Sequence, residues 1–168
     1  MTEIEQRNKA LVLDAFDTLF NKRDYAAAEH FWSPDYIQHS AHIEPGRDGL
    51  FNLIRSSPPT LRYEHQLIVA EGDYVIVHGR FSGTGRPVAW VAADIVRIEN
   101  GRLAEHWDVL QDEATKAESK SGLPMFGDRF TARTNSFIHL QVLIVASQKR
   151  CTSSATRKAA LRSYVLPR

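Results

Sequence analysis

Three polar residues interrupt an otherwise apolar stretch in the middle of the chain. Asp94, His106 and Asp108 lie within residues 88–110, where two hydrophobic runs flank an Asn-Gly pair. Strand positions that only fill a core usually carry Val or Ile, so carboxylates and an imidazole at these positions need another role. Apolar walls raise the pKa of a carboxyl group and let it exchange protons near neutral pH, which indicates general acid–base chemistry.

The Asn-Gly pair predicts a β-hairpin, and the way its turn closes decides which side chains meet. A two-residue type I′ turn places Asp94 and Asp108 on opposite faces of the sheet. A three-residue loop with the glycine in a G1 bulge pairs Asp94 with His106 and gathers all three polar side chains on one face. Ile95 and Trp107 then lie on the other face. We favour the three-residue closure.

Each of these polar residues also has a purely structural explanation. Asp94 could lie on a half-exposed face of the sheet or pair with Arg97 or Arg80. The same explanation applies to Asp108. A strand histidine such as His106 is more often bonded to its neighbours than catalytic. The residues alone leave both interpretations open.

A histidine earlier in the chain could complete such a site. His39 ends a short extended segment, residues 36–39, from which it could point at the mouth of a cavity. A neutral imidazole facing a carboxylate is the usual partnership for moving a proton α to a carbonyl group. A lone loop histidine is also commonly unrelated to function, so this role stays open too.

Helical patterns precede strand patterns along the chain. Thr2 and Glu5 form a capping-box pattern before apolar residues at helical spacing, and the period changes from 3.6 to 2 after the third helical pattern. The expected helices cover residues 3–22, 25–32 and 49–55, and the expected strands cover residues 61–70, 74–83 and the two arms of the hairpin. This order predicts an α+β fold, with one strongly bent antiparallel sheet packed on the N-terminal helices.

The composition is that of an ordinary globular protein. Hydrophobic residues make up 43% and charged residues 24% of the 168 residues, and no apolar run has the length of a membrane span. The N-terminus lacks the apolar segment of a secretory signal, and the single cysteine, Cys151, cannot form an internal disulfide. We therefore expect a cytoplasmic protein without a membrane partner.

The charge is divided unevenly along the chain. Of the 21 Lys and Arg residues, seven follow Phe130, whereas all 20 acidic residues precede it. We therefore expect a functional domain over residues 1–130 and a basic extension, peripheral or mobile, over residues 131–168. The basic residues of the extension are dispersed and lack interleaved aromatic residues, so we expect no nucleic-acid partner.

Motifs for cofactors and metal ions are missing from the sequence. The histidines lack the spacing of metal ligands, and no GxGxxG, Walker or GxSxG motif is present. We expect an activity that needs neither a cofactor nor a metal ion.

Four segments together resemble the SnoaL-like polyketide cyclases of the nuclear transport factor 2-like (NTF2-like) superfamily. They are the N-terminal helix with its acidic start, YIQHS followed by GRDGL, the hairpin DIVRIENGRLAEHWDVLQ, and SGLPMF. The resemblance covers about residues 1–127. It implies a cone-shaped α+β barrel, usually a homodimer, with an open pocket between the curved sheet and the helices. We expect the sheet face that carries Ile95 and Trp107 to form the dimer interface.

The resemblance also implies a cofactor-independent aldol cyclisation or isomerisation of a small hydrophobic molecule that contains a carbonyl group. Asp108 occupies the last-strand acid/base motif, Asp94 and His39 match pocket positions, and the bulged hairpin is favoured. The other expected pocket residues are His106, Phe16, Trp32, Tyr36, Phe51, Ile54, His65, His78 and Trp90. The alternatives are a non-enzymatic binding or dimeric scaffold domain, or a dehydratase of the same fold.

Overall fold

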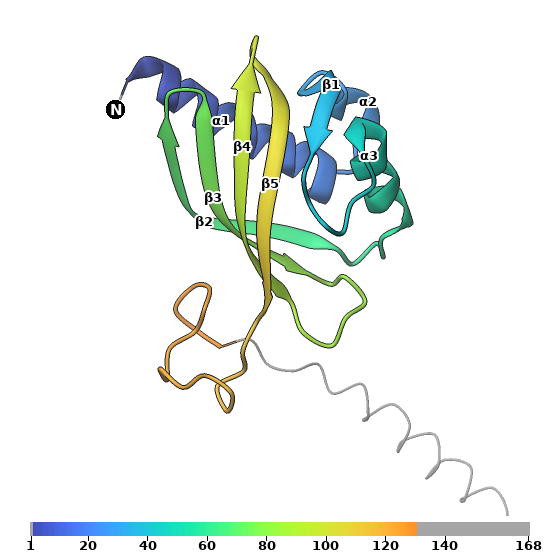
Figure 1. Ribbon diagram of the computed structural model, residues 1–168. Helices are drawn as coiled ribbons and strands as arrows, with labels where there is room; N and C mark the ends of the chain where they lie inside the picture. Colours follow the sequence, from blue (N-terminus) through green and yellow to red (C-terminus); the bar gives the residue numbers. More distant parts are fainter. Residues whose placement is uncertain (1, 131–168) are drawn as a thin grey trace, which may run out of the picture. The chain divides into compact units, whose positions relative to one another are not determined.

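The computed structural model describes residues 2–130, and the expected extension over residues 131–168 lies outside the described residues. Five strands form one sheet in the order β1-β5-β4-β3-β2 (Figure 1). The strands are β1 (Trp32–Gln38), β2 (Arg62–Glu71), β3 (Tyr74–Ser82), β4 (Trp90–Glu99) and β5 (Arg102–Asp112). The helical segments are α1 (Glu3–Phe16), the π-helical turn η1 (Asp17–Asn21), α2 (Tyr25–Ala28) and α3 (Gly46–Ser56).

The expected α+β class is confirmed, because a curled sheet packs against the helices that precede most of its strands (Figure 1). One pairing differs from the expectation of an antiparallel sheet. β1 runs parallel to β5, with Trp32 opposite Leu103 and Gln38 opposite His106, so the sheet is mixed. Among the described residues, no helix has the length and apolar character needed to cross a membrane.

The second helix is shorter than expected because β1 begins early. The helix expected over residues 25–32 ends at Ala28, and Trp32 is already the first residue of β1. Pro34, which we expected to end a helix, lies inside this strand. β1 is an edge strand and its pairing with β5 is irregular between Trp32 and Ile37, so a residue without an N–H removes no regular ladder bond there.

The first helix has the expected cap and ends in a wider turn. The Thr2 N–H donates to Glu5 Oε2 at 2.7 Å and the Glu5 N–H donates to Thr2 Oγ1 at 3.3 Å, which confirms the capping box. From Asp17 to Asn21 the helix continues as the π turn η1. The Asn21 side chain then accepts from the Tyr63 N–H at 2.9 Å and donates to the Tyr63 C=O at 3.1 Å. This pair of bonds ties the end of the helix to β2.

Asn100 and Gly101 close the β4–β5 hairpin as a two-residue turn. Their φ angles are 52° and 72°, in the left-handed region that a type I′ turn requires at both positions. Glu99 pairs with Arg102 across this turn. The three-residue closure that we favoured is therefore wrong.

A bulge directly after the turn nevertheless changes the face of the following side chains. Ile98 pairs with Leu103. The next pair joins Arg97 to Glu105, so Ala104 is an extra residue in β5. Leu103 and Ala104 are both buried, which agrees with a loss of strand alternation at the bulge. Every β5 residue after Ala104 lies on the face opposite to the one that a regular two-residue hairpin would give it.

The bulge brings the polar residues of the hairpin to one face. Asp94 lies directly opposite Asp108, and His106 precedes Asp108 by two residues on the same side of β5. Ile95 lies opposite Trp107 on the other side. The expected faces are thus confirmed, whereas the expected pair of Asp94 with His106 is wrong.

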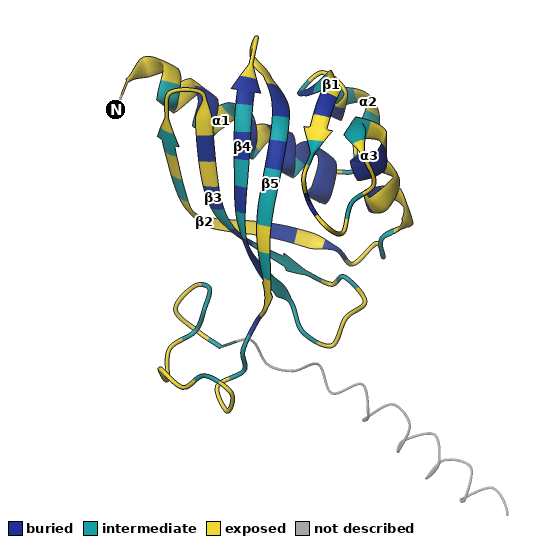
Figure 2. Ribbon diagram, in the orientation of Figure 1, coloured by how far each residue is buried: buried dark blue, intermediate teal, exposed yellow. Residues whose placement is uncertain are grey.

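The core lies between the helices and the face of the sheet that carries these polar residues, here called the inner face. Figure 2 shows buried positions along the middle of β4 and β5 and on the helices. The largest fully buried side chains are Trp32, Phe51, Leu19, Leu103, Val12, Val75, Val77 and Val96. Each contributes about 1.5–3 kcal/mol through burial of apolar surface. This packing fixes the inner face against the helices.

Within residues 2–130, the opposite, outer face of the sheet is covered at one end only. After β5, the Glu113 carboxylate accepts from Arg80 Nε at 2.8 Å, and the Phe126 ring lies 5.5 Å from the ring of His78. Apolar side chains elsewhere on this face are exposed, namely Leu67, Val69, Tyr74, Ile76 and Val109. The outer face therefore presents exposed apolar side chains on β2, β3 and β5.

Candidate functional site

A cavity of about 270 Å³ lies between the inner face of the sheet and the helices. Its walls are mostly apolar and aromatic, and they come from the end of α1 and η1, from α3, and from the sheet. The lining residues are Phe16, Phe20, Tyr36, Ser40, His42, Ile43, Leu50, Leu53, Ile54, Ser57, Leu61, Phe81, Thr84, Arg86, Trp90, Asp94, His106, Asp108 and Leu110. An apolar cavity with a few convergent polar groups is typical of a small-molecule site.

Asp94 and His106 form a buried pair in the wall of this cavity. Their side chains meet at 3.2 Å between Asp94 Oδ1 and His106 Nε2, and the residues are only 2% and 6% exposed. Burial raises the pKa of Asp94, and the nearby charge of Asp108 raises it further, whereas the bond to His106 lowers it. Burial is the largest of these effects, so Asp94 holds a proton to higher pH than an exposed aspartate.

A second hydrogen bond fixes the His106 ring from its other side. Gln38 Oε1 lies 2.9 Å from His106 Nδ1 and accepts the backbone N–H of Ser40, also at 2.9 Å. Gln38 reaches His106 because the two residues are opposite each other in the parallel β1–β5 pair. The imidazole is therefore held at both nitrogens.

Two carboxyl groups of the site have oxygens without a bonded partner within residues 2–130. Asp94 Oδ2 is buried without a hydrogen bond. The half-buried Asp108 carboxylate makes no hydrogen bond to another described side chain, although it lies opposite Asp94. Burial also raises the pKa of Tyr36, and the carboxylates of Asp94 and Asp108 raise it further, so the phenol stays protonated. Both aspartates line the cavity, and Asp108 is the more exposed of the two.

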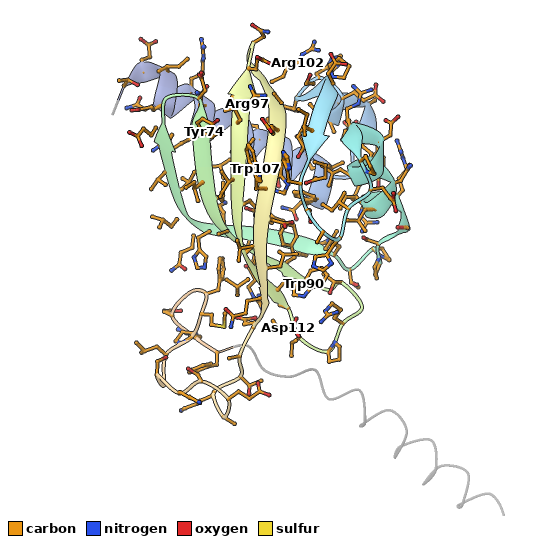
Figure 3. All side chains as sticks on the ribbon, viewed as in Figure 1. Tyr74, Trp90, Arg97, Arg102, Trp107 and Asp112 are labelled. Carbon is orange, nitrogen blue, oxygen red and sulfur yellow. The ribbon has the colours of Figure 1, made fainter. Side chains whose placement is uncertain are left out.

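One end of the cavity is framed by stacked side chains around Trp90 (Figure 3). The Trp90 indole N–H donates to Asp112 Oδ1 at 2.9 Å, and Arg86 donates to the same carboxylate at 3.0 and 3.2 Å. The Arg86 guanidinium lies 4.7 Å from the centre of the Trp90 ring, and the His42 ring stacks at 6.0 Å. These contacts hold the indole as a flat wall beside the cavity.

The cavity contains several of the residues expected from the sequence, namely Asp94, Asp108, His106, Phe16, Tyr36, Ile54 and Trp90. The expected position of His39 at the cavity mouth is wrong. Its backbone N–H donates to the His106 C=O and extends the β1–β5 pairing, so its side chain points away from the face on which Gln38 lies. His39 Nε2 instead lies 2.9 Å from Glu105 Oε1, and its ring stacks 4.8 Å from Trp107.

Four other expected pocket residues also lie outside the cavity lining. His65 is exposed on the edge strand β2, and His78 lies on the outer face against Phe126. Trp32 and Phe51 are fully buried in the core, where their rings meet edge to face at 5.6 Å. Aromatic and imidazole residue types alone did not distinguish core, outer face and cavity.

The residues predicted from the sequence did not include Gln38, Ser40, His42 and Arg86. Gln38 had a usable signal, because it follows Tyr36 by two residues in an extended segment and therefore shares its face. Ser40, His42 and Arg86 lie in loops, where side-chain direction follows no period. Within the described part of the chain, no three His, Cys, Asp or Glu side chains are grouped closely enough to bind a metal ion.

The fold is similar to that of an NTF2-like protein from Cytophaga hutchinsonii, which is 16% identical over 62% of this chain and 89% of its own, with a TM-score of 0.54. The profile of the SnoaL-like domain matches residues 12–106, more than half of the chain. The chain therefore belongs to the SnoaL-like family. No curated protein matches this chain.

Several solved structures are similar to this chain. AclR from Streptomyces galilaeus, a proposed hydroxylase, is 27% identical over 64% of this chain and 90% of its own, with a TM-score of 0.52. A proposed ketosteroid isomerase from Kribbella flavida is 14% identical over 76% of this chain and 97% of its own, with a TM-score of 0.58. A proposed SnoaL-like polyketide cyclase from Jannaschia is 18% identical over 66% and 90%, with a TM-score of 0.56. The last two similarities show the fold alone.

Proposed function

We propose that this protein is a cofactor-independent acid/base enzyme that acts on a small hydrophobic molecule with a carbonyl group, by aldol cyclisation or a related isomerisation. One observation carries the proposal. The unpaired carboxylate of Asp108 lies opposite the buried Asp94–His106 pair in an apolar cavity. Two carboxyl groups in different surroundings are suited to act as base and acid at the same pH.

Asp108 is the base in this proposal. Its carboxylate removes a proton from the carbon next to the carbonyl group, and the electron pair of that C–H bond moves onto the carbonyl oxygen as an enolate. The Asp94–His106 pair, whose burial raises the pKa of Asp94, gives this oxygen the proton held between its two side chains and takes the proton back when the carbonyl group re-forms. His39 has no part in this scheme because it lies outside the cavity.

The two reaction types differ in what the enolate does next. In an aldol cyclisation its carbon forms a bond to a second carbonyl carbon, and the resulting alkoxide takes the proton from Asp108. In an isomerisation Asp108 returns the proton to another carbon of the conjugated system. Both reactions leave the enzyme as it began, so neither consumes a cofactor. Acid–base assistance of this kind contributes about 10²–10⁴ in rate.

The walls of the cavity support a hydrophobic substrate. Phe16, Phe20, Phe81 and Trp90 provide flat apolar surface, and the volume is suited to a small molecule.

A thermal-shift screen of hydrophobic ketones and diketones tests this proposal. A ligand at 100 times its Kd stabilises the folded protein by about 2.7 kcal/mol, which such a screen detects. For a compound that is turned over, Asp108→Asn is expected to lower kcat by about 10²–10⁴ while binding is retained. Asp35→Asn, an exposed position on β1, is the matched control and leaves kcat unchanged. An Asp108→Asn variant with wild-type turnover would refute the assignment.

A non-enzymatic binding domain is the alternative. In such a domain the polar side chains only form hydrogen bonds with one another. A cavity lined by neither Asp94 nor Asp108 would have favoured this alternative. Both carboxylates line the cavity and each keeps an unbonded oxygen, which supports the enzyme. Compounds that bind but are recovered unchanged in every case would favour the binding domain.

We also propose that the outer face of the sheet pairs with a second copy of the chain. Val69, Ile76, Ile95 and Trp107 form one row across four strands, and the first two are 46% and 42% exposed. An apolar row of this length on one face of a sheet is typical of a protein interface. A two-fold axis would place the row against its own copy.

A further inference from the structure

The orientation of the Gln38 amide can be assigned from its neighbours. A backbone N–H can only donate, so the atom that faces the Ser40 N–H at 2.9 Å must be the amide oxygen, Oε1. The same oxygen lies 2.9 Å from His106 Nδ1. An oxygen that accepts cannot also supply the proton for this second contact, so Nδ1 of His106 carries it.

This assignment determines what lies between His106 and Asp94. A neutral imidazole with its proton on Nδ1 has a lone pair on Nε2, and this lone pair faces Asp94 Oδ1 at 3.2 Å. A lone pair and an ionised carboxylate repel each other at that distance. One further proton must therefore lie between the two groups, on His106 Nε2 or on Asp94.

We propose that Gln38 is a positioning residue that holds the proton of His106 on Nδ1 and thereby makes the Asp94–His106 pair a unit with two protons and no net charge. Burial favours the same arrangement, because an unbalanced charge on a pair that is 2% and 6% exposed would be costly. Asp108 is then the carboxyl group of the cavity wall that lies outside this unit. The consequence for catalysis is that the base and the proton donor are separate groups. Only this consequence rests on the proposed function.

Few titratable groups near the Asp94–His106 pair can affect its net charge. Asp108 on β5, Tyr36 on β1 and Tyr63 on β2 are the titratable side chains whose charges act on Asp94 or respond to it. Both phenols are buried and keep their protons, because burial raises the pKa of each. The helical segments contribute only apolar side chains to the cavity, and the polar side chains from the loops are Ser40, His42, Ser57, Thr84 and Arg86.

Histidine ring NMR of the full-length protein labelled with ¹⁵N tests the proposal without any substrate. The His106 signals are assigned by their loss in His106→Gln. In the wild type, Nδ1 is expected to remain protonated at every pH at which the protein is folded. In Gln38→Leu, the neutral ring is expected to carry its proton on Nε2 and to donate it to the Asp94 carboxylate, so that Nδ1 appears unprotonated near neutral pH.

Two further variants keep the result interpretable. Gln38→Glu retains an oxygen acceptor beside Nδ1 and is expected to keep the wild-type tautomer, and it replaces Gln38→Leu as the informative variant if the latter does not fold. Gln111→Leu, an exposed glutamine of β5, is the matched control and leaves the His106 signals unchanged. A wild-type ring with its proton on Nε2, or a Gln38→Leu variant with Nδ1 still protonated, would overturn the proposal. Neither outcome depends on finding a substrate, so this inference and the proposed activity can fail separately.

Discussion

Deleting Ala104 should leave the site intact, although the residue lies inside a central strand. Ala104 is the extra residue of the bulge, so its removal joins Leu103 directly to Glu105. A regular two-residue hairpin then pairs Arg97 with Glu105 and Asp94 with Asp108, which are the pairs already present. All three polar side chains of the cavity would keep their face.

The matched control is the deletion of Ala93, the same residue type in the neighbouring strand without a bulge. Its loss shifts one part of β4 by one residue and turns Asp94, Val96 and Ile98 toward the outer face. Val96 and Ile98 are 0% and 4% exposed, so their removal from the core costs about 3–6 kcal/mol at about 1.5–3 kcal/mol each. Typical domains have only about 5–15 kcal/mol of stability.

The two deletions are compared by urea denaturation followed by circular dichroism. We expect the Ala104 deletion to cost about 1–3 kcal/mol, from one small buried side chain and adjustment of the neighbouring β1. We expect the Ala93 deletion to cost at least twice as much or to prevent folding. Equal losses of stability, or an unfolded Ala104 deletion beside a folded Ala93 deletion, would refute the assignment of the bulge.

Three other predictions concern single side chains. Because burial raises the pKa of Asp94, the folded protein binds a proton that the unfolded chain has released, and wild-type stability falls as pH rises from the ordinary aspartate pKa through the raised one. Asp94→Asn lacks this loss, so its free energy of unfolding relative to wild type should improve as pH rises in that window; a difference independent of pH would contradict this. The Tyr63 hydroxyl is buried without a partner among the described residues, so Tyr63→Phe should leave the Tm unchanged or raise it, and a loss above about 1 kcal/mol would show an overlooked bond. Sedimentation at micromolar concentration should find a dimer for the wild type and a monomer for Trp107→Glu, and a wild-type monomer would exclude the proposed interface.

Most of the fold was predictable because the spacing of apolar residues and the helix-capping residues indicate where helices and strands begin. The change from helical to strand spacing located three helices and the sheet, and the capping box of Thr2 and Glu5 marked the start of α1. The π turn and the extent of β1 were not predictable. Both depend on tertiary contacts, namely the bonds of Asn21 to Tyr63 and the pairing of β1 with β5 far along the chain.

The site was predictable in part, for a related reason. Asp94, His106 and Asp108 stood out as polar residues in an apolar hairpin, and the prediction of a shared face was right although its proposed turn was wrong. Asn-Gly selects the two-residue turn locally, whereas the bulge at Ala104 arises where two adjacent side chains are both buried. His39 was misplaced by one residue, because strand alternation gives the inner position to Gln38.

The hydrogen bonds of Asn21 to Tyr63 affect whether a strand of another molecule can add to the edge of this sheet. β2 is an edge of the sheet, and an edge with free N–H and C=O groups is a template on which a strand of another molecule can add. Asn21 occupies both groups of Tyr63, and a bulge between His65 and Leu67 interrupts the ladder a few residues later. The Gln66 side chain there accepts the N–H of Gly127. Strand addition, the first step toward fibrils, is therefore obstructed in this part of β2, and the sheet can offer its apolar outer face to a second copy without its edge becoming a growing end.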